Sequence, residues 1–248
     1  EAPFLYSIHE EPDPAMFEAF AETAEALGRK FKASLALERG YVQAFLESLK
    51  GTDSERTLNM LLLRSMKRAG YSPVNKGHYG LALGTYGHFT SPIRRYPDLI
   101  LHRQLDTYML RGDGAGETHD YSYYETLGDA VSDREIVTDT AERESIKMKA
   151  AEFMHDKLGE EYDGTVTGIM PIGFFVGLDR YFVEGLVHVS TLVNDYYIID
   201  KAGVSLVGRA TGQRFMLGDR VRVIVTAADK DRGEIDFMVV QELKNRTS

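Results

Sequence analysis

The sequence predicts an α+β protein in which a mostly helical segment is followed by a five-stranded β-barrel. Two observations carry this prediction. Up to about residue 159, apolar residues recur at the spacing of amphipathic helices, and beyond it this spacing gives way to strand-like alternation. Of the 248 residues, 43% are hydrophobic, which is enough to build one large core or two of ordinary size.

Three stretches near the N-terminus have helical spacing. The first places its apolar residues on one face: Met16, Phe17, Phe20, Ala24 and Leu27. The second and third span residues 41–49 and 57–69. A β-like stretch rich in glycine and aromatic residues follows over 78–89, and residues 97–110 predict a further helix.

The helix over 97–110 has clear start and stop signals. Pro97 suits the first helical turn, and Asp98 is expected to cap the helix and to face the positive end of its dipole. The glycine-rich run 111–116 is expected to end the helix as a mobile loop. Ser132 and Glu135 have the spacing of a capping box, which predicts that a long helix opens there and runs to about Leu158.

The C-terminal part predicts five strands separated by turn residues. The strands are expected at residues 162–169, 173–178, 182–188, 220–228 and 234–240. Five short strands in so small a segment suit a closed barrel of the OB type. We therefore expect a domain over 1–159, an OB-type domain over 160–243 and a tail over 244–248.

Composition limits the environment and the partners. The chain has no cysteine, which excludes disulfides and thiolate metal sites and suits a cytoplasmic protein. The longest apolar stretch, residues 58–63, is too short to cross a bilayer, so we expect no membrane association. The net charge of −9 lacks the basic excess common in nucleic-acid binders, so RNA binding would require local cations and stacking aromatics.

The most informative segment is residues 87–99, in which Arg94 and Arg95 lie between Pro92 and Pro97 just before a predicted helix. Guanidinium groups match phosphate oxygens in a bidentate geometry, so this loop could clamp a phosphodiester. The alternative is a solvated loop whose arginines pair with nearby carboxylates.

The run His-Phe-Thr-Ser-Pro-Ile-Arg-Arg-Tyr-Pro-Asp-Leu over 88–99 resembles the signature of the RNase II/RNase R (RNB) family of 3′-to-5′ exoribonucleases. Residues 62–67 and 77–83 are similar to the family stretch just before that signature. Residues 173–176, 184–190 and 194–197 resemble the family's terminal RNA-binding domain, of the S1 type. The resemblance implies the C-terminal part of a catalytic domain followed by an OB-fold RNA-binding domain.

The resemblance also implies residue roles. Arg94 is expected to contact the phosphate at the scissile end, and Glu142 the terminal nucleotides, although Glu142 alone would be read as one acid on a charged helix face. The further RNA-binding candidates are Arg95, His88, Tyr96, Phe175, His188, Phe174 and Arg222. Two positions depart from the family pattern: Ile172 stands where an aromatic residue is common, and Glu234 where a basic residue is usual. Both departures argue for a weaker affinity of the barrel for RNA.

The family hydrolyses RNA with magnesium held by clustered aspartates. Before Asp98 the chain has only Asp13 and Asp53, which are isolated, so no metal ligand is expected in this chain. The expected partners are single-stranded RNA 3′ ends and an N-terminal half of the same monomeric enzyme. That enzyme would release nucleoside 5′-monophosphates processively, and this chain alone would be inactive. The alternative is a non-catalytic single-stranded RNA-binding module.

Overall fold

The computed structural model describes residues 4–38, 40–52, 54–110 and 120–243. The chain divides into two compact units. The first consists of residues 1–13 and 66–141, and the second of residues 14–65 and 142–248. The expected glycine-rich loop over 111–116 and the tail over 244–248 lie outside the described residues.

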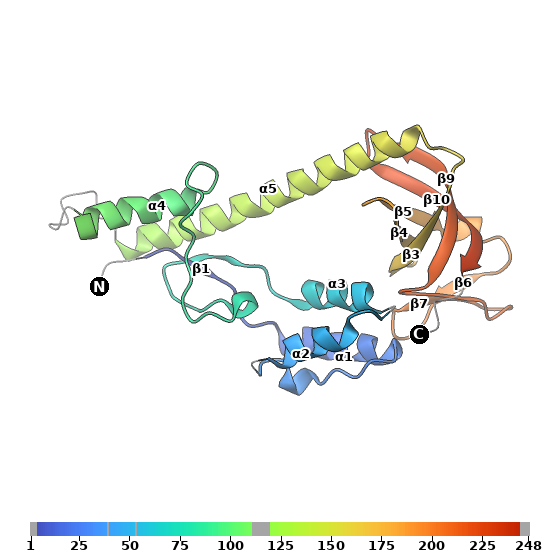
Figure 1. The fold of residues 1–248 in the computed structure, drawn as a ribbon, viewed down its shortest axis with the longest axis horizontal. Coiled ribbons are helices and arrows are strands. Elements are labelled where there is room, and N and C mark those ends of the chain that lie inside the picture. The colour runs from blue at the N-terminus through green and yellow to red at the C-terminus, as the bar shows by residue number, and fades with distance from the viewer. Residues whose placement is uncertain (1–3, 39, 53, 111–119, 244–248) are drawn as a thin grey trace. The chain divides into compact units, whose positions relative to one another are not determined.

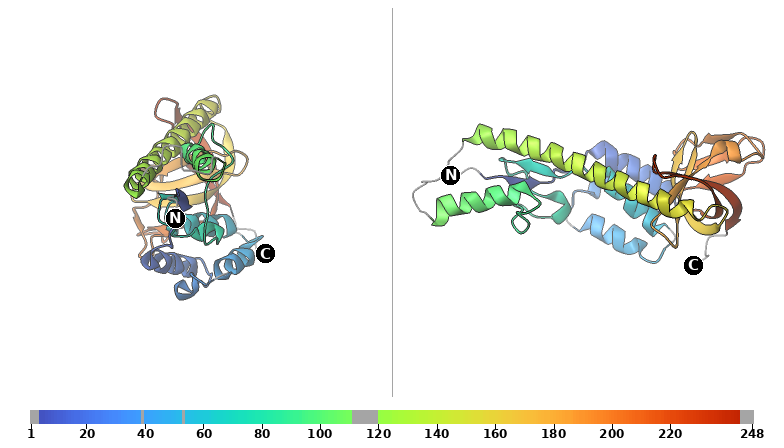
Figure 2. Two further views of the ribbon diagram at one scale, coloured as in Figure 1. Left: turned by 90° about the vertical axis from the view of Figure 1, so that its left-hand side faces the viewer. Right: turned by 90° about the horizontal axis from the view of Figure 1, so that it is seen from above.

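The helices are α1 (Pro14–Ala26), α2 (Tyr41–Leu49), α3 (Glu55–Ser65), α4 (Tyr96–Leu105) and α5 (Tyr121–His155). The strands are β1 (Tyr6–Ile8), β2 (Gly70–Ser72), β3 (Glu161–Met170), β4 (Gly173–Leu178), β5 (Glu184–His188), β6 (Tyr197–Ile199), β7 (Ser205–Gly208), β8 (Arg214–Met216), β9 (Arg220–Asp229) and β10 (Glu234–Leu243). Figures 1 and 2 show α5 as one uninterrupted helix that belongs in part to each unit. None of the described helices is long and apolar enough to cross a membrane.

The first unit is built around a short antiparallel pair, β1 and β2, in which Ser7 lies opposite Tyr71. Helix α5 packs closely against β2, because a Cβ at Gly128 would lie 2.7 Å from the backbone oxygen of Tyr71. Ser132 adds a hydrogen bond at this contact by accepting the Tyr71 amide at 2.9 Å. A residue larger than glycine at 128 would force the strand away from the helix.

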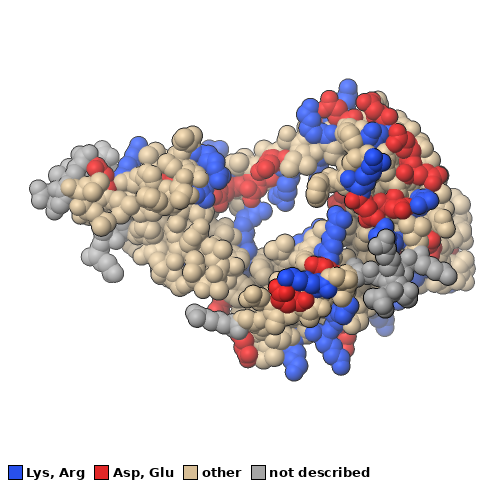
Figure 3. All heavy atoms as spheres, in the orientation of Figure 1, with Lys and Arg blue, Asp and Glu red and all other residues tan. Residues whose placement is uncertain are grey.

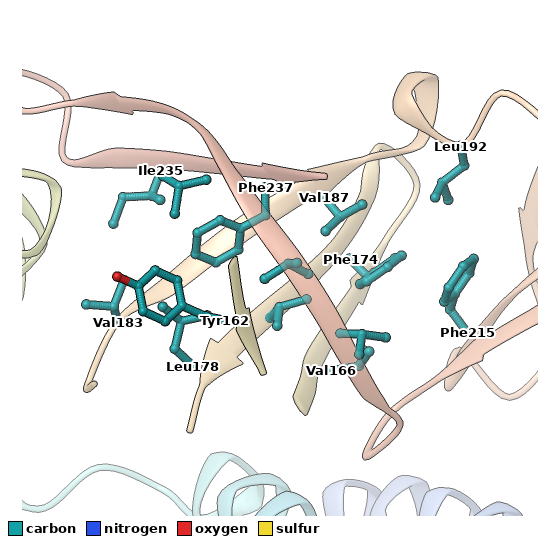
Figure 4. Close-up of a cluster of buried hydrophobic side chains, with 14 of the residues drawn as sticks. Tyr162, Val166, Phe174, Leu178, Val183, Val187, Leu192, Phe215, Ile235 and Phe237 are labelled. Carbon is teal, nitrogen blue, oxygen red and sulfur yellow. The ribbon is translucent and has the colours of Figure 1, made fainter. Parts of the chain in front are cut away.

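The second unit contains the predicted barrel, closed in the order β10-β5-β4-β3-β9. Alternate residues of its strands point inward, so that Val221, Val223 and Val225 are buried while the residues between them are only partly covered. Figure 4 shows the resulting core, with Phe174 and Phe237 directed into the interior. The α+β fold class and all five predicted strands are confirmed, and strand ends differ by no more than three residues.

Several sequence predictions need correction. Residues 78–89 form a short 3-10 helix (Tyr79–Leu81) and isolated bridges at His78, because tight turns and side-chain contacts shape this segment. Helix α5 begins at Tyr121, so Ser132 lies inside the helix, and its hydroxyl donates to the Gly128 carbonyl at 2.7 Å. The three-stranded sheet β6-β7-β8 was not predicted, because its strands are only three or four residues long.

Candidate nucleic-acid interface

The segment that carries Arg94 is a tight turn just before α4. The Ser91 carbonyl accepts the amides of Arg94 at 3.2 Å and Arg95 at 2.9 Å, and α4 begins one residue later at Tyr96. Pro97 occupies the first turn of α4, as predicted. The backbone of the turn is therefore held by its own hydrogen bonds and by the helix that follows.

Asp98 holds this turn in place through hydrogen bonds to Ser91 and Arg95. Its carboxylate is completely buried, and Oδ1 accepts the Ser91 amide at 2.6 Å and the Arg95 Nη2 at 3.0 Å. Burial would raise the pKa of Asp98, but the Ser91 amide and the Arg95 guanidinium outweigh it and hold the pKa below its usual value. The predicted capping role was wrong, because Asp98 closes the preceding turn and no side chain caps α4 at Arg95.

The two arginines of the turn have different environments. Arg95 is mostly covered and paired with Asp98. Arg94 is exposed, and within the described part of the chain it has no ion pair or side-chain hydrogen bond. Tyr96, one of the RNA-binding candidates, is 44% exposed at the start of α4. The turn therefore exposes the guanidinium of Arg94, while the guanidinium of Arg95 binds Asp98 and helps to hold the turn in place.

A second anchor lies upstream of the turn. His88 Nδ1 is 2.7 Å from the Tyr71 hydroxyl, which donates to Glu135 Oε1 on α5, also at 2.7 Å. Nearby, His102 of α4 lies 2.8 Å from the Phe89 carbonyl. The sequence singled out His88 but gave no signal for Tyr71 or for this role of Glu135, because the three residues lie on separate elements.

Glu142 is the second catalytic candidate that the family resemblance implies. It is exposed on α5 and belongs to the second unit. Its environment in the described structure is that of a solvated side chain on a charged helix. Its expected role near the terminal nucleotides stays a prediction.

The barrel offers a second candidate surface on β4 and β5. Phe175 is half-buried and pairs with Leu186, whereas His188 is exposed and pairs with Gly173. Because side chains two residues apart share a strand face, Phe175 and His188 lie on the same outer face of the barrel. Gly168 lies opposite Phe175 on β3, so no side chain from that position covers the ring.

Two other barrel candidates have structural partners. Phe174 is completely buried and stacks on Phe215, with ring centroids 4.8 Å apart, so we leave it out of the proposed surface. Arg222 is held by Asp163 through Nε at 2.7 Å and Nη2 at 3.2 Å. A phosphate would have to compete with that carboxylate.

Comparison with known proteins agrees with this arrangement of parts. Residues 1–111 match the RNB domain, and residues 155–239 match the S1 RNA binding domain. A ribonuclease R of Aquifex aeolicus is 42% identical over 242 residues, which are 98% of this chain and 34% of the relative. A ribonuclease R of Escherichia coli is 40% identical over 246 residues, which are 96% of this chain and 30% of the relative. The chain therefore joins an RNB domain to an S1 RNA binding domain.

Solved structures give the same result for the fold of this chain. The apo form of Mycoplasma genitalium RNase R superimposes with a TM-score of 0.86 at 25% sequence identity, covering 96% of this chain and 38% of that chain. The same enzyme in complex with ribose methylated single-stranded RNA superimposes with a TM-score of 0.87 at the same identity and coverage. The chain spans about a third of the length of the curated relatives it matches.

Proposed function

We propose that this chain is part of a processive 3′-to-5′ exoribonuclease that hydrolyses RNA to nucleoside 5′-monophosphates. It would act as a monomer on single-stranded RNA 3′ ends, together with an upstream segment of the same enzyme. The observation that carries this proposal is the exposed guanidinium of Arg94. It lies on a turn in which the other arginine, Arg95, is paired with the buried carboxylate of Asp98.

Arg94 would act on the phosphate at the scissile end. Hydrolysis of a phosphodiester places extra negative charge on the phosphate oxygens in the transition state. A guanidinium already held in position stabilises that charge without reorganising. Glu142 would lie near the terminal nucleotides, and the barrel face with Phe175 and His188 would hold the strand by stacking.

Magnesium would activate the attacking water in such an enzyme. Among the described residues no group of three or more His, Asp or Glu side chains could hold a metal ion. The family resemblance implies magnesium ligands in an upstream segment of the same enzyme, and the proposal gives this chain no metal step.

Replacing Arg94 tests the proposal in the complete gene product. Arg94→Ala should lower kcat on single-stranded RNA by about 100-fold and change RNA affinity far less, because the contact strengthens in the transition state. The measurements are mononucleotide release and equilibrium binding. The control is Arg103→Ala, an exposed arginine of α4. An unchanged kcat in Arg94→Ala would remove Arg94 from the mechanism.

The alternative function is a non-catalytic module that binds single-stranded RNA. The S1 domain over 155–239 favours it for this chain taken alone. Release of mononucleotides by the 248-residue chain would exclude this alternative, and release by neither the chain nor the complete gene product would exclude the exoribonuclease.

A further inference from the structure

The hydrogen bonds around Tyr71 have a fixed direction. Tyr71 is 4% exposed, and its hydroxyl lies 2.7 Å from both Glu135 Oε1 and His88 Nδ1. Burial and the hydrogen bond to Glu135 both raise the pKa of Tyr71, so the hydroxyl keeps its single proton. A carboxylate can only accept, so that proton points to Glu135 and the Tyr71 oxygen must accept from His88.

This direction determines the state of His88. Burial, followed by the positive charge of Arg95, lowers the pKa of His88, while Asp98 and Glu135 oppose the shift. The ring is therefore neutral at physiological pH and carries one proton. That proton must be on Nδ1 in order to reach Tyr71, which leaves Nε2 as an acceptor.

The hydrogen bonds that join His88, Tyr71 and Glu135 hold the segment that leads into the arginine turn. Tyr86 packs edge-on against the His88 ring, with centroids 5.5 Å apart, and its backbone oxygen accepts the Ser7 amide at 3.0 Å. Downstream, Asp98 holds Ser91 and Arg95. The segment from 88 to 95 is thus anchored at both ends, and Arg94 extends from it.

We infer that Tyr71 and Glu135 are positioning residues that hold His88 as the neutral Nδ1–H tautomer and thereby set the geometry of the Arg94 turn. The inference rests on the proposed function for its catalytic part. Its consequence for binding is that His88 offers RNA an acceptor at Nε2 and no N–H for a phosphate oxygen. Any RNA group that His88 binds would be a hydrogen-bond donor.

The tautomer is tested without catalysis, by nitrogen NMR of the imidazole rings in the full chain at neutral pH. We expect a protonated Nδ1 and an unprotonated Nε2 at His88. Glu135→Gln should move part of the population to the Nε2–H form, because a glutamine amide can donate to Tyr71 and release the tyrosine proton toward His88. A wild-type Nε2–H tautomer or imidazolium would overturn the inference.

The positioning role is tested by kinetics in the complete gene product. Tyr71→Phe and Glu135→Gln should each lower kcat by about 10-fold with little change in KM, and the double variant should lose little more than either alone. The matched control is Tyr86→Phe, which keeps the ring packed on His88 and removes a hydroxyl that has no hydrogen-bond partner among the described residues.

Three outcomes separate the two proposals. If the wild-type gene product releases no mononucleotides, the proposed function fails while the tautomer result stands by itself. If RNA is degraded and Tyr71→Phe and Glu135→Gln match Tyr86→Phe in kcat, the positioning role is overturned. If both variants lose kcat while their melting temperatures stay within the range of the control, the role is supported.

Discussion

Asp98 is the residue on which the arginine turn depends most. It is completely buried, and its Oδ2 and the Nε of Arg95 have no hydrogen-bond partner among the described residues. Within the described part of the chain, the carboxylate is therefore hydrogen-bonded through Oδ1 only, by the Ser91 amide and the Arg95 guanidinium. Such a side chain is kept in place by the whole turn, so small changes there should have measurable effects.

Asp98→Asn should lower the free energy of unfolding by about 2 kcal/mol, because the charged hydrogen bonds to Ser91 and Arg95 become neutral. Chemical denaturation of the full chain measures this change. Asp133→Asn, an exposed acid of α5 in the same unit, should have almost no effect. Equal stabilities of the two variants would contradict the role of Asp98.

The lowered pKa of Asp98 also predicts a pH dependence. The folded-state pKa lies below the unfolded-state value, which is about 3.9. The contribution of Asp98 to stability is complete above the unfolded-state pKa and is lost as the pH falls through the folded-state pKa. This acid step should be smaller in Asp98→Asn when the free energy of unfolding is measured from pH 7 down to pH 2.5 or so.

At the scale of elements, the β4–β5 pair places the candidate RNA surface of the barrel. Gly173 begins β4 with a φ of +151°, and a Cβ there would collide with the backbone oxygen of Val187. The close approach lets β4 pair with β5 in the register that sets Gly173 opposite His188. Glycine is needed at this position for both conformation and space.

Gly173→Ala should therefore lower the free energy of unfolding by about 3 kcal/mol, because β4 and β5 must move apart. The matched control is Gly168→Ala in β3, where the added Cβ would lie 3.5 Å from the Phe175 ring, an ordinary contact. That variant should change stability by less than about 1 kcal/mol. Urea denaturation checks both variants, and a Gly173→Ala barrel as stable as the control would contradict the packing argument.

At the scale of the whole molecule, charge limits how RNA can be bound. The net charge is −9, and on the face drawn in Figure 3 acidic and basic side chains occur side by side. Several arginines are already in ion pairs with carboxylates: Arg95, Arg214, Arg220 and Arg222. These four guanidinium groups are less available to phosphates, so we expect stacking to supply much of the affinity.

We expect the affinity of the full chain for single-stranded RNA to fall only gently with salt. About three phosphate contacts would give a slope near −2 in a plot of log K against log salt concentration. Phe175→Ala should weaken binding by about 10-fold and leave that slope unchanged, because it removes stacking. Titrations between low and moderate salt measure both quantities. A slope steeper than about −5 would mean that a larger cationic surface binds the RNA.

Local patterns of the sequence were enough to predict the helices α1 to α3, the five barrel strands and the family signature around Arg94. These features depend on neighbouring residues, through helical spacing, strand alternation and turn residues. Phe174 and Phe175 show what local sequence patterns cannot predict. Adjacent strand residues face opposite sides, but only the barrel register decides that Phe174 enters the core and Phe175 stays partly exposed.

Only the tertiary structure decided which side chains hold the arginine turn. Tyr71 and Glu135 are 64 residues apart in the sequence, and Tyr71 and His88 are 17 apart. No local spacing encodes such contacts, because they depend on how β2 and α5 pack around Gly128. The sequence alone therefore determined that an arginine-bearing loop of the RNB family is present. The packing determined that Arg94 is the free guanidinium, that Arg95 is bound to Asp98, and that His88 is joined to Tyr71 and Glu135.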